Sequence, residues 1–146
     1  NGLAALLALL LVALFVNISK HVFFPGLARP VGFLGDGHGL HLVEGVNVHH
    51  RRTFPSGHTA AAFSLFMSVS LLAPRHFKWA VWPSFLLALL VGVSRVYLSQ
   101  HFPMDVVAGA WLGSFSSLFM FGLAASPTFA RKLPARPLIR PKPRGR

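Results

Sequence analysis

The sequence predicts an all-α integral membrane protein, a bundle of about four transmembrane helices with a long loop on its outward side. Three observations predict it. Of the 146 residues, 53% are hydrophobic. Only 12% are charged, against about 25% in soluble globular domains. The apolar residues also form long blocks, each suited to a membrane span. Length favours one compact unit, residues 1–125, and the absence of cysteine excludes disulfides.

The first apolar block covers residues 3–16 and continues to Lys20. Because a lysine can extend its ammonium group to the interface, this block is long enough to cross the hydrocarbon core. The alternative is a cleaved signal peptide, but a basic n-region and a small-residue cleavage pattern are missing. Asn17-Ile18-Ser19 matches a glycosylation sequon, but its place at a membrane boundary argues against modification. Since the first residue is Asn and not Met, we expect a fragment or a processed form.

Residues 24–54 have a different character, because proline and glycine recur throughout them. This composition interrupts regular structure and predicts a loop or a short re-entrant segment. Long loops in compact proteins are usually either functional or disordered. An alternative metal site would use Asp36, His38, His41, Glu44, His49 and His50. Their spacing matches no standard pattern, so we expect no metal. Arg51 and Arg52 are interpreted as contacts for a headgroup or lipid phosphate, with generic interfacial charge as the alternative.

The second apolar block, residues 60–73, follows Pro55-Ser56-Gly57-His58. Pro55 suits the first turn of a helix, and serine and threonine, both present in this stretch, are good N-caps, so we expect a helix to begin here. A basic turn at residues 74–78 leads to the third block, residues 79–93.

The fourth block, residues 104–125, precedes a basic, proline-rich tail, residues 126–146. Four spans place residues 20–54 and 94–105 on one side, and residues 74–78 and the tail on the other. The second side carries nine lysines and arginines and no acid. Since cytoplasmic segments carry the Lys/Arg excess, we expect a cytoplasmic tail and an outward loop. The net charge of +11 is thus an orientation signal and not a nucleic-acid site.

The stretch of residues 94–105 places charged groups between two apolar blocks. Such groups are costly beside hydrocarbon, so they are functional candidates. Arg95 offers a planar fork for phosphate. His101 lies four residues before Asp105, a spacing that suits a carboxylate orienting an imidazole. The alternative is that Arg95 and Asp105 are interfacial charges at helix ends.

The outward side also carries His58, a second histidine. Displacement at phosphorus uses one neutral imidazole as the nucleophile and one protonated imidazole as the acid. Two histidines, the nearby cations and a helix N-terminus therefore predict a site for a phosphate-sized anion.

These motifs resemble those of the type 2 phosphatidic acid phosphatase (PAP2) superfamily. Pro55-Ser56-Gly57-His58 resembles its second signature, and Ser94-Arg95-x5-His101-x3-Asp105 its third. Lys20 with Arg29-Pro30 resembles the first signature, across a gap of eight residues where six are usual. The resemblance implies the last four helices of a six-helix bundle.

It also implies a metal- and cofactor-independent phosphatase that acts through a phosphohistidine. His101 would be the nucleophile, Asp105 its orienting partner and His58 the general acid. The phosphoryl oxygens would be held by Lys20, Arg29, Ser56, the Gly57 backbone N–H and Arg95.

We therefore expect hydrolysis of a phosphomonoester or pyrophosphate on a membrane lipid, at the outer face of a bacterial-type cytoplasmic membrane. Candidates are phosphatidate, phosphatidylglycerophosphate, undecaprenyl pyrophosphate and lipid A phosphates. Two alternatives remain. The first is a non-catalytic membrane module that binds anionic headgroups. The second is a vanadate-dependent haloperoxidase, which the apolar spans disfavour.

Overall fold

The computed structural model describes residues 2–35, 39–40, 42–43 and 49–126. Its helices are α1 (Gly2–Ile18), η1 (Ser19–Phe23), α2 (Pro30–Leu34), α3 (Gly57–Leu72), η2 (Arg75–Ala80), α4 (Val81–Tyr97) and α5 (Pro103–Ala125). Among the described residues the extended pairing is one isolated bridge, Ala28 with Arg51. The all-α prediction is confirmed. Residues 127–146, which make up nearly all of the predicted tail, lie outside the described residues.

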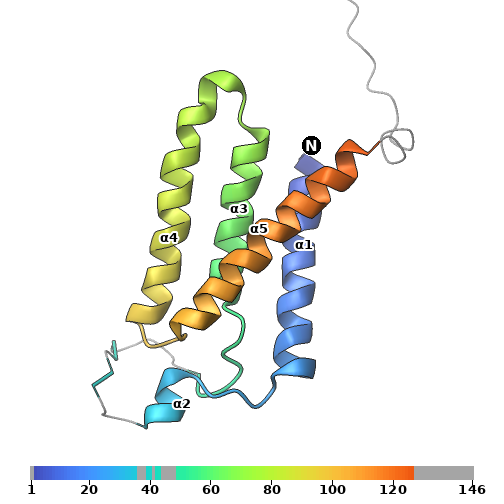
Figure 1. Cartoon of the computed structure of the whole chain (residues 1–146). Coiled ribbons are helices and arrows are strands. Elements are labelled where there is room, and N and C mark those ends of the chain that lie inside the picture. The colour runs from blue at the N-terminus through green and yellow to red at the C-terminus, as the bar shows by residue number, and fades with distance from the viewer. Residues whose placement is uncertain (1, 36–38, 41, 44–48, 127–146) are drawn as a thin grey trace, which may run out of the picture.

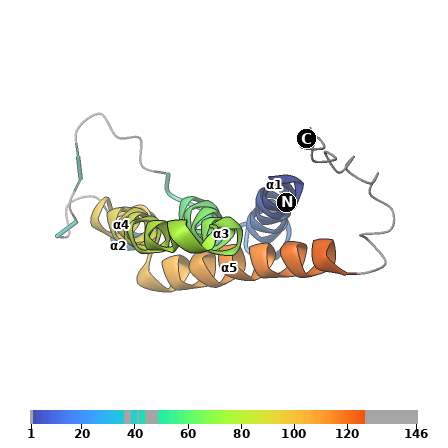
Figure 2. The same ribbon diagram turned by 90° about the horizontal axis from the view of Figure 1, so that it is seen from above.

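The four long helices form a bundle in which α3 is central (Figure 1). Viewed along the bundle, α4, α3 and α1 stand in a row and α5 runs along one side of that row (Figure 2). In the described part of the chain, three helical segments are long and apolar enough to cross a membrane: Gly2–Phe23, Arg75–Tyr97 and Pro103–Ala125. The remaining long helix, α3, is apolar but shorter, at 16 residues.

Small residues allow α5 to approach α3 closely. A Cβ at Gly109 would lie 2.5 Å from the carbonyl oxygen of Ser56, and one at Gly113 would overlap the carbonyl oxygen of Ala60. One turn further on, the Ser117 hydroxyl donates to the Ser64 carbonyl at 2.9 Å. Close backbone approach with interhelical hydrogen bonds is typical of packing in membranes, where water supplies no hydrophobic driving force between helices. The α3–α5 contact therefore fixes the start of α3 against α5.

Helix boundaries differ from the sequence prediction in three places. Within residues 24–54 the chain forms α2, because Pro30 occupies an N-terminal position where its missing N–H is not needed. Pro55 precedes the N-cap residue Ser56, so it lies outside α3 and not in its first turn. The helix α4 continues to Tyr97 and α5 begins at Pro103. Only residues 98–102 connect them, and Arg95 lies in the last turn of α4.

A short antiparallel pairing connects the chain after α1 with the chain before α3. The Arg29 N–H donates to the His50 carbonyl at 2.9 Å, and the Thr53 N–H donates to the Leu27 carbonyl at 3.4 Å. Ala28 and Arg51 form the bridge between these two bonds. The pairing closes the base of the intervening excursion and brings Arg29 to the residues that precede α3.

Four helix ends meet at one end of the bundle: the end of η1, the start of α3, the end of α4 and the start of α5 (Figure 1). These are the ends that carry the sequence motifs. The turn formed by η2 lies at the opposite end (Figure 1). The prediction that the motifs share one end of the bundle is confirmed.

Candidate active site

A pocket of about 320 Å³ opens where the helix ends meet. Its lining residues are Lys20, Arg29, His49, His58, Arg95, Gln100 and His101. Five of these are site residues predicted from the sequence, and they come from four separate segments: η1, the chain before α2, the start of α3, and the α4–α5 junction. The pocket has a strongly basic lining, as an anion-binding site requires.

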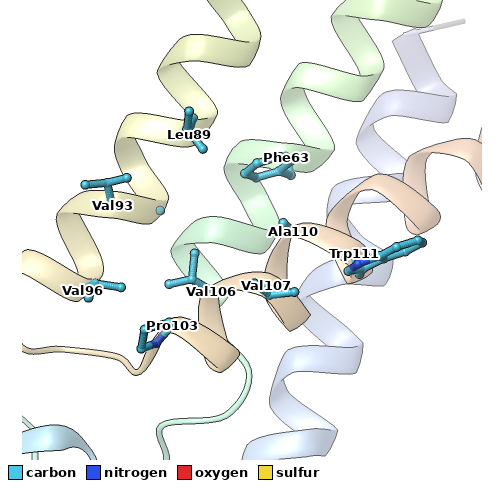
Figure 3. Close-up of a pocket in the computed structure, with 10 residues that line it drawn as sticks. Phe63, Leu89, Val93, Val96, Pro103, Val106, Val107, Ala110 and Trp111 are labelled. Carbon is cyan, nitrogen blue, oxygen red and sulfur yellow. The ribbon is translucent and has the colours of Figure 1, made fainter.

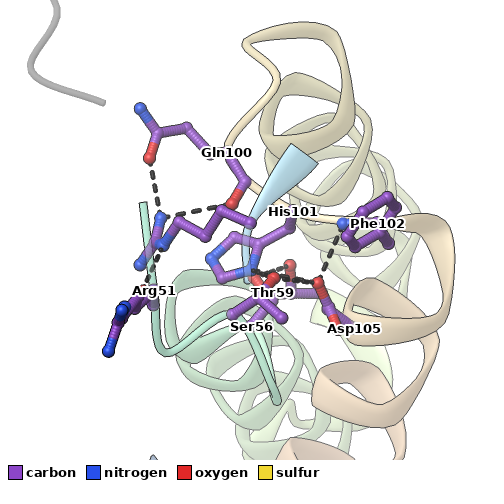
Figure 4. Close-up of polar contacts among 9 residues, drawn as sticks. Arg51, Ser56, Thr59, Gln100, His101, Phe102 and Asp105 are labelled. Atoms are coloured by element: carbon purple, nitrogen blue, oxygen red, sulfur yellow. Dashed lines mark hydrogen bonds and ion pairs between the residues drawn. The ribbon is translucent and has the colours of Figure 1, made fainter. Parts of the chain in front are cut away.

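The His101 imidazole lies beside the buried carboxylate of Asp105. Its Nδ1 lies 3.5 Å from Oδ2 of Asp105, and both residues are almost fully buried, at 3% and 4% exposed. An imidazole whose Nδ1 faces a carboxylate carries its proton there, so Nε2 is left unprotonated and nucleophilic. Figure 4 shows the two side chains facing each other.

Asp105 is itself held in place by three contacts. The Thr53 hydroxyl and the Phe102 N–H, the latter at 2.8 Å, donate to its Oδ2. The Ser56 N–H donates to its backbone carbonyl at 3.0 Å. Asp105 therefore caps the start of α5, as the structural alternative predicted, and the same oxygen faces His101. The capping contact is therefore observed, and the role of Asp105 in orienting His101 stays a prediction that this geometry allows.

Arg29 is buried and fixed by hydrogen bonds. Its Nη1 donates to Oε1 of Gln100 at 2.7 Å and to the Gln100 carbonyl at 3.2 Å. Its Nε donates to the Arg51 carbonyl at 3.1 Å. Figure 4 labels the two residues that accept these bonds, Gln100 and Arg51. A guanidinium held this rigidly is preorganised to bind an anion such as a phosphoryl group.

Lys20 and Arg95 approach the pocket from two different helices. Lys20 belongs to η1, a π-helical turn, and such turns are frequent at functional sites. Its Nζ lies near the first residue of α3, since a Cβ at Gly57 would be 3.9 Å from it. Arg95 is half-buried, with Nε 3.3 Å from the Ser94 hydroxyl.

The residues of the Pro-Ser-Gly-His motif occupy different positions relative to the pocket. His58 lines it directly. Ser56 is completely buried, and its hydroxyl bonds to the Thr59 hydroxyl at 2.9 Å. Neither Ser56 nor Gly57 is among the lining residues. Ser56 therefore contributes through its backbone, by joining the start of α3 to Asp105.

The surroundings of His101 act on its proton affinity in opposite directions. Burial lowers the pKa of His101, and the positive charges of Arg29 and Lys20 lower it as well, whereas the Asp105 carboxylate raises it. The net effect is a lowered pKa, which favours the neutral imidazole needed for attack. Burial also lowers the pKa of Arg29 from a value far above neutrality, so its guanidinium stays charged.

Three residues near the pocket were not predicted as site residues. Thr53 connects to both Asp105 and His101, with Oγ1 3.4 Å from Nδ1 of His101. Gln100 anchors Arg29, and His49 lines the pocket. Thr53 and Gln100 are close in sequence to motif residues, but this closeness is only a weak sign that they belong to the site. Their roles depend on partners 48 or more residues away in the chain.

The alternative metal site is only partly described. Asp36, His38, His41 and Glu44 lie outside the described residues. In the ranges that the structure does describe, no three His, Cys, Asp or Glu side chains gather in a metal-binding arrangement. His49 and His50 instead face basic neighbours at the pocket and beside it.

An apolar groove of about 430 Å³ runs between α4 and α5, with Phe63 of α3 also in its lining. Figure 3 shows Val93 and Val96 on α4 opposite Pro103, Val106 and Val107 on α5. All ten lining residues are apolar. The groove includes Pro103, only two residues from His101, so its end lies close to the polar pocket.

Comparison with known proteins gives a consistent result. The family model of the PAP2 superfamily matches residues 1–127. The chain is 40% identical over 81 residues to the bacitracin transport permease protein BcrC of Bacillus licheniformis, covering 56% of this chain and 38% of that protein. It is 29% identical over 116 residues to an undecaprenyl-diphosphatase of Sulfolobus acidocaldarius, covering 80% and 52%.

Among solved structures, the crystal structure of Aquifex aeolicus LpxE is similar to this chain. The TM-score is 0.62 at 33% sequence identity, over 82% of this chain and 66% of that one. The chain thus spans about half or less of the length of the curated relatives described above.

Proposed function

The chain belongs to the PAP2 superfamily, and on this premise we propose that it forms the catalytic part of a membrane lipid phosphatase. The reaction is hydrolysis of a phosphomonoester or pyrophosphate through a phosphohistidine on His101. The observation that carries the proposal is the His101–Asp105 contact at 3.5 Å, beside a pocket that His58, His49 and three cations also line.

In the first step, Nε2 of His101 attacks phosphorus and the bond to the leaving oxygen breaks. His58, protonated, gives its proton to that oxygen, so the lipid leaves as a neutral hydroxyl or as a lipid monophosphate. Asp105 stabilises the positive charge on the phosphorylated imidazole. Lys20, Arg29 and Arg95 hold the phosphoryl oxygens and the charge that spreads over them in the transition state.

In the second step, water hydrolyses the phosphohistidine. His58, now neutral, takes a proton from the water as its oxygen attacks phosphorus. Inorganic phosphate leaves, and both histidines return to their starting protonation states. No step requires a metal or a redox change.

The apolar groove and the relatives support a lipid substrate. A hydrocarbon chain attached to a phosphate in the pocket can follow the α4–α5 groove, whose lining is wholly apolar. The relatives include one protein named for undecaprenyl diphosphate. The groove and this name therefore support a substrate with a hydrocarbon chain in the membrane.

We also propose that the site faces the outside of a bacterial-type cytoplasmic membrane, with the tail in the cytoplasm. Support comes from the distribution of lysine and arginine in the sequence, because Arg75 and Lys78 in η2 lie at the end of the bundle opposite the pocket.

The proposed function is tested by replacing the nucleophile. In detergent or proteoliposomes, His101→Asn lowers phosphate release from phosphorylated lipids by at least about 10³-fold, since no other group forms the covalent intermediate. The matched control is His76→Asn, at an exposed position in η2 at the far end of the bundle, and it keeps full activity. Turnover by the His101→Asn protein would refute the nucleophile assignment.

Three further readouts separate the alternatives. Rapid quenching with a phosphorus-labelled lipid gives acid-labile, base-stable label on the parent protein and none on the His101→Asn protein. EDTA leaves the rate unchanged, whereas strong inhibition would favour the metal site. Headgroup binding without any phosphate release would identify a non-catalytic module.

A further inference from the structure

A second basic cavity adjoins the catalytic pocket. Its volume is about 530 Å³. Its lining residues are Lys20, His21, Arg29, His49, His50, Arg51 and Arg52. Lys20, Arg29 and His49 line both cavities. An anion bound in one cavity would therefore lie next to an anion bound in the other. We call this second cavity the outer basic site.

The outer basic site has a defined backbone frame. Arg51 forms the bridge with Ala28, and its carbonyl accepts a hydrogen bond from Nε of Arg29 at 3.1 Å. The backbone of Arg29 is bonded to His50 at 2.9 Å. The same hydrogen bonds that position Arg29 in the catalytic pocket therefore position the chain that carries Arg51 and Arg52.

Arg52 adopts a backbone conformation that an ordinary residue avoids. Its φ is +62°, in the left-handed region that costs a non-glycine residue free energy. Its Nη1 lies 3.1 Å from Nε2 of His21, a residue of η1. The structure thus keeps a strained arginine beside the end of α1, where its guanidinium lines the cavity.

The number of positive charges exceeds what one phosphoryl group needs. A phosphomonoester carries about −1.5 to −2 at neutral pH, and Lys20, Arg29 and Arg95 already surround the catalytic pocket. Arg51 and Arg52 add two charges that the proposed chemistry at phosphorus does not use. Within the described part of the chain, no carboxylate lines the outer basic site. Its charge suits a second anionic group of the same kind.

We infer that the outer basic site binds a second phosphoryl group of the substrate while the first is transferred to His101. The inference rests on the proposed function and names its substrate class: a lipid that carries two phosphoryl groups. The second group is either the adjacent phosphate of a lipid diphosphate or a phosphate elsewhere on a larger headgroup. Arg51 and Arg52 then determine specificity and take no part in bond breaking.

Binding tests the inference without turnover. The His101→Asn protein is titrated with inorganic phosphate and with pyrophosphate by calorimetry. Adding Arg51→Gln and Arg52→Gln together weakens pyrophosphate binding about 10- to 100-fold, because two charge-assisted contacts are lost, and changes phosphate binding less than about 3-fold. The matched control, Arg75→Gln, lies in η2 at the other end of the bundle and changes neither. Equal weakening for both anions, or none for pyrophosphate, would overturn the inference.

Turnover distinguishes the two sources of the second phosphate. The Arg51→Gln/Arg52→Gln protein with His101 intact is assayed on a lipid monophosphate, a lipid diphosphate and a lipid phosphorylated at two distant positions. We expect kcat/KM to fall about 10- to 100-fold, through KM, for one of the last two, and to stay constant for the monophosphate. The substrate that loses activity identifies the source. An equal loss on all three would overturn the inference.

The two proposals fail in different ways. If the parent protein releases phosphate from none of the lipids, the proposed function fails, and selective pyrophosphate binding through Arg51 and Arg52 still stands. If the parent is active but the double variant matches it on every lipid, the outer basic site fails and the phosphatase proposal stands.

Discussion

At the scale of single residues, the imidazole of His101 lies between a carboxylate and a group of cations. Its Nδ1 faces Asp105 at 3.5 Å, while Arg29 and Lys20 line the pocket around it. The buried position and the cations outweigh the carboxylate, so the pKa of His101 is lowered. The neutral, nucleophilic form therefore persists to lower pH than it would in a free histidine.

This balance predicts a pH dependence. At low pH His101 is protonated and cannot attack, so kcat/KM falls. We expect this acidic limb of the profile at a pH below about 6.5, the ordinary pKa of histidine. Arg29→Gln removes a positive charge, raises the pKa of His101 and moves this limb to higher pH. The measurement is a pH profile of kcat/KM for both proteins. Arg75→Gln, far from the site, leaves the limb in place, and a shift to lower pH in Arg29→Gln would contradict the electrostatic account.

The site residues that belong to sequence motifs were the easiest to predict. Lys20, Arg29, His58, Arg95 and His101 were expected together, and they line one pocket. Thr53 and Gln100 were not expected, because a hydroxyl or an amide becomes important only through a distant partner. Thr53 acts on Asp105, and Gln100 acts on Arg29. Spacing in one sequence carries no information about such contacts.

At the scale of the elements, the close contact of α5 with α3 gives a test of packing. Gly113→Ala places a methyl group against the Ala60 carbonyl, 2.9 Å from the Ser64 nitrogen. We expect the free energy of unfolding to fall by about 1–3 kcal/mol, which is typical of overpacking. This loss occurs although alanine favours a helix by about 1 kcal/mol over glycine. Thermal unfolding in detergent measures the loss.

Gly122→Ala is the matched control, because nothing lies within 4 Å of a Cβ at that position of the same helix. It keeps or raises the unfolding temperature. Equal behaviour of the two variants would show that α3 and α5 do not approach as closely as described.

The apolar blocks predicted the long helices but not all of their ends. Hydrophobicity stops at residue 93 in the third block, whereas α4 continues to Tyr97 and includes Arg95. A cation in the last turn of a helix interacts favourably with the helix dipole, so polarity did not mark the boundary. The helix α2 was missed because glycine and proline were interpreted only as interruptions, although a proline suits the start of a helix.

At the scale of the whole molecule, the proposed orientation can be tested directly because the chain has no cysteine. Single cysteines are introduced at Phe33 in α2 and at Phe77 in η2, which are 73% and 49% exposed. A membrane-impermeant maleimide labels Phe33→Cys in intact cells and labels Phe77→Cys only after permeabilisation. The reverse pattern would place the active site in the cytoplasm.

The gathering of the motifs at one end of the bundle followed from counting spans, since an even number of crossings returns the chain to the same side. The outer basic site did not follow from such counting. It depends on the pairing of Ala28 with Arg51, and this contact across 23 positions has no signature in charge or hydropathy.

That pairing has a consequence for how the protein can diversify. Both ends of the excursion between Arg29 and His50 are joined by a backbone hydrogen bond at its base, so its length can change without moving the catalytic groups. Doubling such a loop costs only about 0.6 kcal/mol in closure entropy. The segment between Arg29 and His50 can therefore be replaced as a unit. Grafting it from a relative onto this base would leave His58, His101 and Asp105 in place. Arg51 and Arg52, which follow the excursion, would keep their role in specificity.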